Sequence, residues 1–211
     1  MELKQNNLIK ALNSQPLILV IRLDNDFFNI PSKRDNLFLK LEKLSNHGIK
    51  NIEIGWQINK EWIDLISEIK KNFKYINLGA ASINSLEALD SILELNLNYS
   101  MSPFFNKGVQ IKAIERNQLV IPGISNIQTF KEAINLGYKI IKIFPASKLG
   151  IEFLNKLKEF SENDIYFIGA GGIKSCDIKK LLKNDYNAVA IGKELKNHTP
   201  DKDLKIWLKS L

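Results

Sequence analysis

Short apolar runs rich in strand-forming residues recur along the chain at a nearly regular interval. Most of them begin about 20 to 25 residues after the previous one, and the segments between them carry apolar residues at helical spacing. Strands that alternate with helices in this way form parallel sheets that the helices cover. The eight runs are LILVI (17–21), NIEIGW (51–56), YINLGA (75–80), NYSMSP (98–103), LVIPG (119–123), YKIIKIFPA (138–146), DIYFIGA (164–170) and NAVAIG (187–192).

The number of these units predicts how the sheet is closed. With PDKDLKIWLKSL (200–211) as the last helix, the chain has eight strands and eight helices, which is the number that closes a (β/α)8 TIM barrel. A doubly wound sheet would have fewer strands and a G-x-G-x-x-G after the first, and a solenoid would show a leucine-rich pattern; neither motif is present. We therefore expect residues 1–211 to form a single α/β TIM-barrel domain.

Polar residues and glycines mark the expected ends of the helices. Ser82, Asn84 and Ser125 precede helical segments and are expected helix starts, whereas Gly48 and Gly137 follow such segments and are expected helix stops.

Composition excludes several classes of function. One cysteine cannot form an intrachain disulfide, and two histidines do not make a His-rich metal site. The net charge of +7 comes from lysines interleaved with acids in helical segments, without the dense basic block of a nucleic-acid site. No apolar run is long enough to span a membrane, and the polar N-terminus lacks the apolar region of a signal peptide. A cytoplasmic protein is expected.

Charged residues interrupt three of the predicted strands. If Ile141 and Ile143 face the helices, Lys142 faces the barrel interior; the same alternation directs Glu53 inward, and Arg22 ends the first strand on its inner face. One lysine could reach water from the edge of a surface element, but this does not explain three convergent charges. We interpret them as one functional site, at the C-terminal ends of the strands.

A lysine in such an interior can act as a nucleophile. Burial lowers its pKa, as does a nearby cation such as Arg22. The neutral amine of Lys142 could attack a ketone and form a Schiff base, which is an electron sink for making or breaking a carbon–carbon bond. Glu53 could then carry protons to and from the intermediates. The alternative is a structural ion pair between Lys142 and Glu53, and the two interpretations are compatible in the resting state.

Glycine-rich turns follow the last two predicted strands. Gly171 and Gly172 run from a strand into a helix, and Gly192 ends the final strand with Lys193 beside it. In TIM barrels the loops after strands seven and eight commonly bind phosphate through backbone N–H groups at a helix N-terminus. We expect a phosphate site here, with Lys193 adding charge; tight packing is the alternative explanation of the glycines.

Three more residues fall at strand ends. Ser82 could donate a hydrogen bond to a substrate carboxylate or could cap the next helix, and the sequence favours neither role. For Ser102 and Pro103 the simple explanation is turn chemistry.

Several motifs resemble those of the 2-keto-3-deoxy-6-phosphogluconate aldolases, a family of class I aldolases that also includes the 4-hydroxy-2-oxoglutarate aldolases. The motifs are VIR (20–22), IEI (52–54), IPGIS (121–125), KIFPA (142–146) and GGI (171–173). They follow the family order over nearly the whole chain. KIFPA with IPGIS about 20 residues upstream is a specific pairing, whereas GGI alone is not.

This resemblance implies a homotrimeric TIM barrel that uses neither a metal nor an organic cofactor. Lys142 would match the Schiff-base lysine and Glu53 the general acid and base. The other matching positions are Arg22 at a substrate-anion contact, Ser102 and Pro103 on the pyruvate side of the pocket, and Gly171, Gly172 and Gly192 near the phosphate.

The chain also departs from the family pattern. Gln57 stands where the family has an arginine that helps to hold the pyruvate carboxylate, and an amide gives a weaker contact than a charge-assisted pair. Ala81 replaces a glycine before the hydroxyl of Ser82, Ala170 replaces a threonine, and Lys193 replaces a serine. The Schiff-base residues match the family, whereas the residues expected to contact the two ends of the substrate differ from it.

The favoured function is a lyase that splits a 2-keto-4-hydroxy acid into pyruvate and an aldehyde. The aldehyde would be glyceraldehyde 3-phosphate from 2-keto-3-deoxy-6-phosphogluconate, or glyoxylate from 4-hydroxy-2-oxoglutarate. Two alternatives are an isomerase or epimerase of phosphorylated sugars with Glu53 as base, and a non-catalytic barrel that binds an anionic metabolite. Failure to trap a pyruvate adduct would favour the alternatives.

Overall fold

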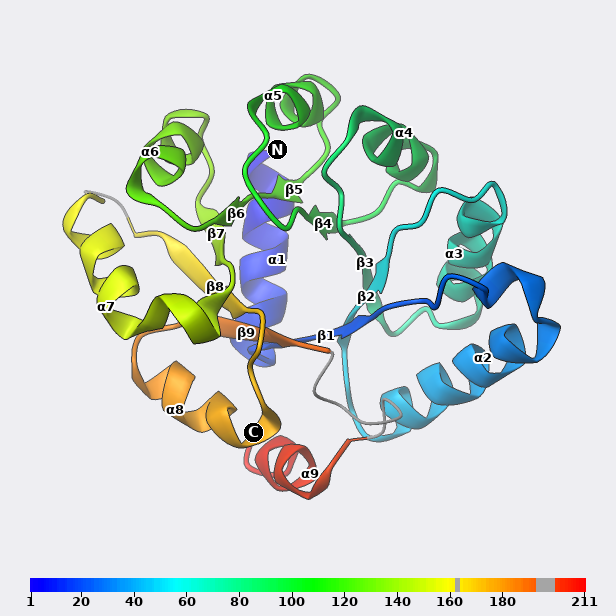
Figure 1. The fold of residues 1–211 in the computed structure, drawn as a ribbon. Helices are drawn as coiled ribbons and strands as arrows, with labels where there is room; N and C mark the ends of the chain where they lie inside the picture. The colour runs from blue at the N-terminus through cyan, green and yellow to red at the C-terminus, as the bar shows by residue number, and fades with distance from the viewer. Residues whose placement is uncertain (162–163, 193–199) are drawn as a thin grey trace.

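The computed structural model describes residues 1–161, 164–192 and 200–211 (Figure 1). The strands are β1 Leu17–Ile21, β2 Asn51–Gly55, β3 Asn77–Ala81, β4 Tyr99–Met101, β5 Val120–Ile121, β6 Gly123–Ile124, β7 Ile140–Ile143, β8 Tyr166–Ala170 and β9 Ala188–Ile191. The α-helices are α1 Glu2–Ser14, α2 Pro31–Asn46, α3 Glu61–Asn72, α4 Leu86–Leu95, α5 Lys107–Glu115, α6 Ile127–Asn135, α7 Ala146–Glu159, α8 Ile178–Lys183 and α9 Lys202–Leu208. The short 3-10 helices are η1 Phe27–Asn29 and η2 Ser175–Asp177.

The strands form one parallel sheet that closes into a barrel. Their order is β5-β4-β3-β2-β1-β9-β8-β7-β6, so the two edges of the sheet are β5 and β6. These two strands are halves of one run, separated only by Pro122, whose carbonyl accepts a hydrogen bond from the backbone N–H of Lys142 (3.1 Å). Counted as one strand, β5 and β6 complete the eight strands of a TIM barrel. Figure 1 shows the helices arranged around the ring of strands.

The strands are buried along nearly their whole length because helices cover the outside and side chains fill the inside. The core is built from apolar residues of every strand and from the inner faces of α1 to α9. This explains why the strands are almost continuously apolar in sequence. Within the described residues, no helix has both the length and the apolar character needed to cross a membrane.

Helix α1 is additional to the eight helices expected from the repeat. It lies across the N-terminal end of the barrel, behind the strands in Figure 1. The side chain of Gln5 bonds to the carbonyl of Gly137 (3.1 Å) and to the N–H of Lys139 (2.7 Å), just before β7. Gln15, just after the helix, binds the carbonyl of Gly48 and the N–H of Lys50 in the same way, just before β2 (both 2.8 Å). Helix α1 therefore closes the end of the barrel opposite to the candidate site.

The helix ends agree only partly with expectation. The predicted stops are confirmed, since Gly48 and Gly137 follow α2 and α6 with φ of 80° and 85°. The predicted starts are wrong by one to three residues. Ser85 caps α4 and Asn126 caps α6, each accepting a hydrogen bond from a backbone N–H in the first turn.

Candidate active site

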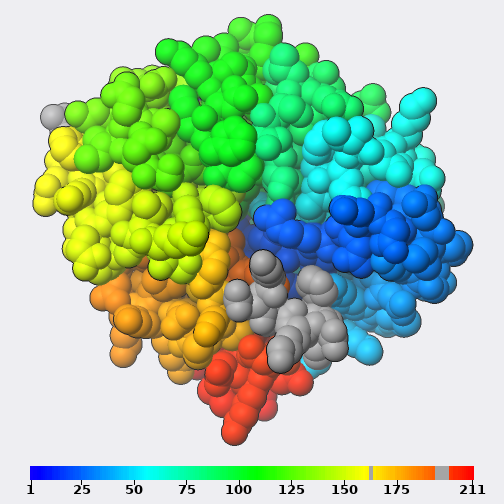
Figure 2. Space-filling model, in the orientation of Figure 1, coloured from blue at the N-terminus to red at the C-terminus, as the bar shows by residue number. Residues whose placement is uncertain are grey.

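A cavity of about 200 Å³ opens at the C-terminal ends of the strands. Figure 2 shows this face, where the segments after β1 (blue), after β4 (green) and after β7 and β8 (yellow to gold) surround the centre. The cavity is lined by Val20, Arg22, Glu53, Ala81, Ser82, Met101, Pro103, Lys142, Phe144, Ala170, Gly171, Gly172, Ile173, Ala190, Ile191 and Gly192. The three charged strand residues that the alternation directs inward therefore line one cavity.

Lys142 is a buried residue of β7 that lines this cavity. It is 7% exposed, and its Nζ lies 5.4 Å from the ring centroid of Phe144, two residues further along the chain. Burial, opposed by Glu53 and aided by Arg22, lowers the pKa of Lys142 from 10.5 to about 8. The lowered pKa makes the neutral, nucleophilic form of the amine more accessible than in an exposed lysine.

Glu53 faces Lys142 from the opposite side of the barrel, because β2 and β7 are four strands apart in both directions around the ring. It is 1% exposed on β2, where it pairs in register with Val20 of β1 and Gly79 of β3. Burial raises the pKa of Glu53 from 4.5 to about 8, against the opposing effects of Lys142 and Arg22. Its Oε1 has no hydrogen-bond partner among the described residues. The attraction between Glu53 and Lys142 acts through space, without the direct ion pair that a purely structural role would produce.

The combination can perform acid–base and covalent chemistry. An amine whose pKa is lowered and a carboxyl group whose pKa is raised can exchange a proton with a bound molecule at little free-energy cost. Perturbed pairs of this kind are concentrated at active sites. The two groups share a cavity, so a substrate that binds covalently to Lys142 lies within reach of Glu53.

Arg22 and Ser82 form a polar pair at the mouth of the cavity. Nη1 of Arg22 donates a hydrogen bond to Oγ of Ser82 (3.2 Å). Ser82 has a φ of 69°, a left-handed conformation that is uncommon for serine. It does not cap α4, because Ser85 does, so the capping role considered for Ser82 is wrong. The guanidinium and the hydroxyl provide donors for an anionic group in the cavity.

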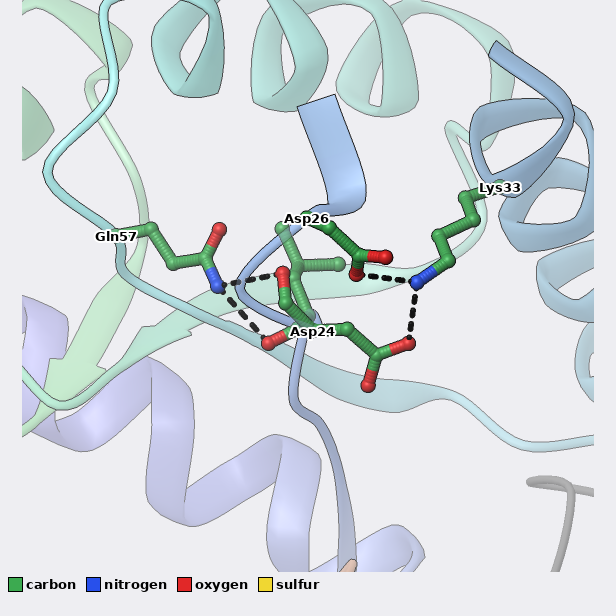
Figure 3. Close-up of polar contacts among 5 residues, drawn as sticks. Asp24, Asp26, Lys33 and Gln57 are labelled. Carbon is green, nitrogen blue, oxygen red and sulfur yellow. Dashed lines mark hydrogen bonds and ion pairs between the residues drawn. The ribbon is translucent and has the colours of Figure 1, made fainter. Parts of the chain in front are cut away.

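Gln57 does not line the cavity. Its Nε2 donates to the carbonyls of Leu23 (2.9 Å) and Asp24 (3.1 Å), in the loop that follows β1. On the other side of this loop, Lys33 of α2 forms ion pairs with Asp24 and Asp26 (Figure 3). The loop directly after Arg22 is thus tied to two neighbouring elements. Sequence reasoning treated Gln57 as a weaker ligand and could not foresee this backbone contact.

Ser102 and Pro103 follow β4 and have different surroundings. Ser102 is fully buried, and its hydroxyl donates to the carbonyl of Phe104 (2.6 Å), which is the turn chemistry considered above. Pro103 lines the cavity, and its carbonyl lies so close to Gly123 that a Cβ atom there would overlap it. Close approach of the loop after β4 to strand β6 therefore requires glycine at position 123.

The glycines after β8 also line the cavity, and close packing requires them. Gly171 and Gly172 have φ of 89° and 69°, and a Cβ on Gly171 would lie 2.7 Å from the ring of Phe144. The N–H of Ser147 donates to the carbonyl of Gly171 (3.2 Å), which ties the loop to the start of α7. The glycines do not run directly into an α-helix as expected, because η2 lies between them and α8. Gly192 lines the same cavity, and Lys193 lies outside the described residues.

Tyr99 is a buried residue near the site that sequence reasoning missed. It is 1% exposed, and its hydroxyl has no hydrogen-bond partner within the described ranges. Burial, and to a smaller extent the charge of Glu53, raises the pKa of Tyr99. The alternation of side chains along a strand could have identified it, because Tyr99 lies two residues before the cavity residue Met101 and therefore on the same face of β4.

A family model described as "KDPG and KHG aldolase" matches residues 9–205. The chain belongs to this aldolase family. The residues around Lys142 and Glu53 thus lie within the matched region. Two curated relatives are similar to this chain. A 2-dehydro-3-deoxy-6-phosphogalactonate aldolase of Escherichia coli (strain K12) is 22% identical over 56% of this chain and 58% of the relative. A 2-dehydro-3-deoxy-phosphogluconate aldolase of Treponema pallidum (strain Nichols) is 24% identical over 52% of this chain and 52% of the relative. The matches thus span little more than half the length of these relatives.

Solved structures of the family share the fold of this chain. A structure described as native KDPGal has a TM-score of 0.76 at 18% identity, over 92% of this chain and 94% of that one. A KDPG aldolase from Legionella pneumophila, in which pyruvate was captured at low pH as a covalent carbinolamine intermediate, has a TM-score of 0.75 at 19% identity, over 94% and 91%. An N-acetylmannosamine-6-phosphate 2-epimerase from Clostridium perfringens also has this fold, with a TM-score of 0.68 at 16% identity, over 97% and 96%. The fold by itself therefore does not decide the reaction.

Proposed function

We propose that this chain is a class I aldolase that reversibly cleaves a 2-keto-4-hydroxy acid to pyruvate and an aldehyde. The observation that carries the proposal is the pairing of a buried lysine of lowered pKa with a buried glutamate of raised pKa in one small cavity, in a member of an aldolase family. The reaction needs no metal or organic cofactor, because the iminium formed on the lysine serves as the electron sink.

The proposed cycle begins with attack of the neutral Lys142 amine on the C2 ketone. The resulting carbinolamine loses water to give an iminium, with Glu53 donating the proton that the leaving hydroxyl needs. Glu53, now a carboxylate, takes the proton of the C4 hydroxyl as the C3–C4 bond breaks. The aldehyde leaves, and the bonding electrons remain in an enamine. Protonation of the enamine at C3 and addition of water to the iminium release pyruvate and regenerate Lys142.

Arg22 and Ser82 are proposed to bind the carboxylate of the keto acid. Their hydrogen bond places a cation and a hydroxyl together at the mouth of the cavity, and both can donate to an anion. Gln57 supports this assignment indirectly, since its amide binds the loop after Arg22 and leaves the carboxylate contact to other residues.

The preferred substrate is 2-keto-3-deoxy-6-phosphogluconate, which gives glyceraldehyde 3-phosphate, and the smaller 4-hydroxy-2-oxoglutarate, which gives glyoxylate, is the second candidate. The phosphate would lie against the loops of Gly171, Gly172 and Gly192, which line the side of the cavity formed by β8 and β9. Residues Ser102 and Pro103 would form the pyruvate side, and of the two Pro103 lines the cavity. By family likeness we also propose a homotrimer in the cytoplasm.

Pyruvate release from the two keto acids tests this function. Purified protein is given each substrate, and pyruvate is followed continuously with a coupled dehydrogenase. Lys142→Ala should lose turnover of both, while Lys139→Ala, which removes an exposed lysine paired with Glu2, should keep it. Cleavage of neither substrate by the folded wild-type protein would refute the proposal and favour an isomerase, an epimerase or a binding role.

A further inference from the structure

Two buried polar atoms beneath the candidate site have no hydrogen-bond partner in the described part of the chain. They are Oε1 of Glu53 and the hydroxyl of Tyr99, and each residue is 1% exposed. A buried polar atom without a partner bears its full desolvation cost, and native proteins contain few of them. Two such atoms beside the proposed Schiff-base lysine require an explanation.

The strand register puts Tyr99 and Glu53 in one row. Gly79 of β3 pairs with Glu53 of β2 on one side and with Tyr99 of β4 on the other. Neighbouring strands are about 4.8 Å apart, so the two Cα atoms are about 10 Å apart. A tyrosine and a glutamate side chain that point toward each other can span this gap.

Gly79 leaves the path between them open. A Cβ atom at this position would lie 2.6 Å from Cζ of Tyr99, the ring carbon that carries the hydroxyl. The far end of the ring therefore lies over the backbone of β3, and the hydroxyl extends toward β2. The electrostatics agree with this direction: burial is the main cause that raises the pKa of Tyr99, and the charge of Glu53 raises it further.

We propose that Tyr99 is a positioning residue for Glu53, and that its hydroxyl is the hydrogen-bond partner of the Glu53 carboxyl group during proton transfer. A hydroxyl can both donate and accept. It can donate to the carboxylate and, after rotation of its proton, accept from the carboxylic acid. It therefore serves both protonation states that Glu53 adopts in the cycle. Met101 lines the cavity and Tyr99 does not, so Tyr99 acts through Glu53 without touching the substrate.

The charges around Glu53 determine the sign of the expected effect. Lys142 of β7 and Arg22, just after β1, both favour the carboxylate. In the proposed hydrogen bond, the Tyr99 hydroxyl of β4 is a neutral donor that favours it too. Removing this donor makes the carboxylate less stable and raises the pKa of Glu53. In the iminium complex Glu53 must be ionised to take the C4 proton, so the acid limb of the kcat profile, which reports the groups of that complex, then moves to higher pH.

Tyr99→Phe tests the inference, which rests on the proposed function. Phenylalanine keeps the ring over Gly79 and removes only the hydroxyl. We expect kcat for keto-acid cleavage to fall about tenfold with KM within about twofold, and the acid limb to rise by about one pH unit, as loss of a hydrogen bond to a charged group implies. The matched control is Tyr186→Phe, which removes another buried hydroxyl without a partner in the described structure, beside Gly169 on the outer side of the barrel. It should leave the rate and the profile unchanged.

Three results would overturn the inference. The first is a Tyr99→Phe variant with the kcat and the acid limb of the wild type. The second is a Tyr99→Phe variant with a lower kcat and an unshifted acid limb. The third is a loss of stability to denaturant in Tyr99→Phe that accounts for its lost activity. Reductive trapping with pyruvate separates this inference from the proposed function. An adduct in the wild type together with an unchanged Tyr99→Phe refutes only the role of Tyr99, whereas no adduct in the wild type refutes the proposed function.

Discussion

Replacing Lys142 by methionine should abolish activity and make the barrel more stable at neutral pH. The folded state holds the ammonium in the barrel interior, where burial is the main cause that lowers its pKa from 10.5 to about 8. Each pKa unit corresponds to about 1.4 kcal/mol, so the buried charge costs the folded state about 3 kcal/mol at pH 7. Methionine has a similar volume and no charge, so it removes this cost without leaving a cavity.

The sign depends on pH. Below pH 8 Lys142 is protonated in both the folded and the unfolded chain, and the folded state bears the full cost. Between pH 8 and 10.5 the folded state loses the proton first, so the cost falls, and above 10.5 it disappears. Glu53 changes this little, because its raised pKa leaves it mostly protonated at pH 7 with or without the ammonium. The gain from Lys142→Met should therefore be greatest at pH 7 and small above pH 10.

Denaturant unfolding of both proteins at pH 7 and pH 10 measures this difference. We expect Lys142→Met to raise the free energy of unfolding by about 3 kcal/mol at pH 7, and to raise it much less at pH 10. Lys139→Met is the control, because this lysine is half exposed and paired with Glu2, and it should change stability little. A Lys142→Met protein that is no more stable than the wild type at pH 7 would show that the ammonium is compensated in the barrel and would refute the reasoning.

Three further predictions concern single residues of the site. Glu53→Gln should lower kcat for cleavage by about 100-fold to 10,000-fold, because the proton acceptor is lost, while the protein stays folded by circular dichroism; a loss below tenfold would exclude Glu53 as the acid and base. Gln57→Ala should raise KM for the keto acid about tenfold with little change in kcat, because two hydrogen bonds that fix the loop after Arg22 are lost, and steady-state kinetics with an unchanged KM would contradict this. Gly79→Ala should lower the free energy of unfolding by about 1 to 3 kcal/mol, since the added methyl overlaps the Tyr99 ring, and an equally stable variant would contradict the close contact.

The barrel could be predicted from the sequence because its signals are local. The alternation of apolar residues fixes which face of each strand is inside, and this was sufficient to bring Lys142 and Glu53 into one cavity. Two features escaped prediction for the opposite reason. Helix α1 binds the N-terminal barrel end through long-range amide contacts of Gln5, and Pro122 divides one strand into β5 and β6.

The loops around the cavity were predicted less well than the strands. The direction of the Gln57 amide depends on carbonyls of a loop 33 and 34 residues earlier in the chain, which the local sequence does not indicate. The left-handed conformation of Ser82 moves the start of α4 to Ser85, although serine at either position is compatible with a cap. The row that joins Glu53, Gly79 and Tyr99 depends on pairing across three strands, and only the folded sheet reveals it.

Borohydride reduction in the presence of pyruvate, followed by peptide mass mapping, tests the central claim most directly. The account predicts that the wild-type protein gains the mass of one reduced pyruvate adduct, that the modified peptide carries Lys142, and that Lys142→Ala gains none. A folded wild-type protein that forms no adduct, or an adduct located on a different lysine, would contradict the claim that Lys142 is the Schiff-base residue.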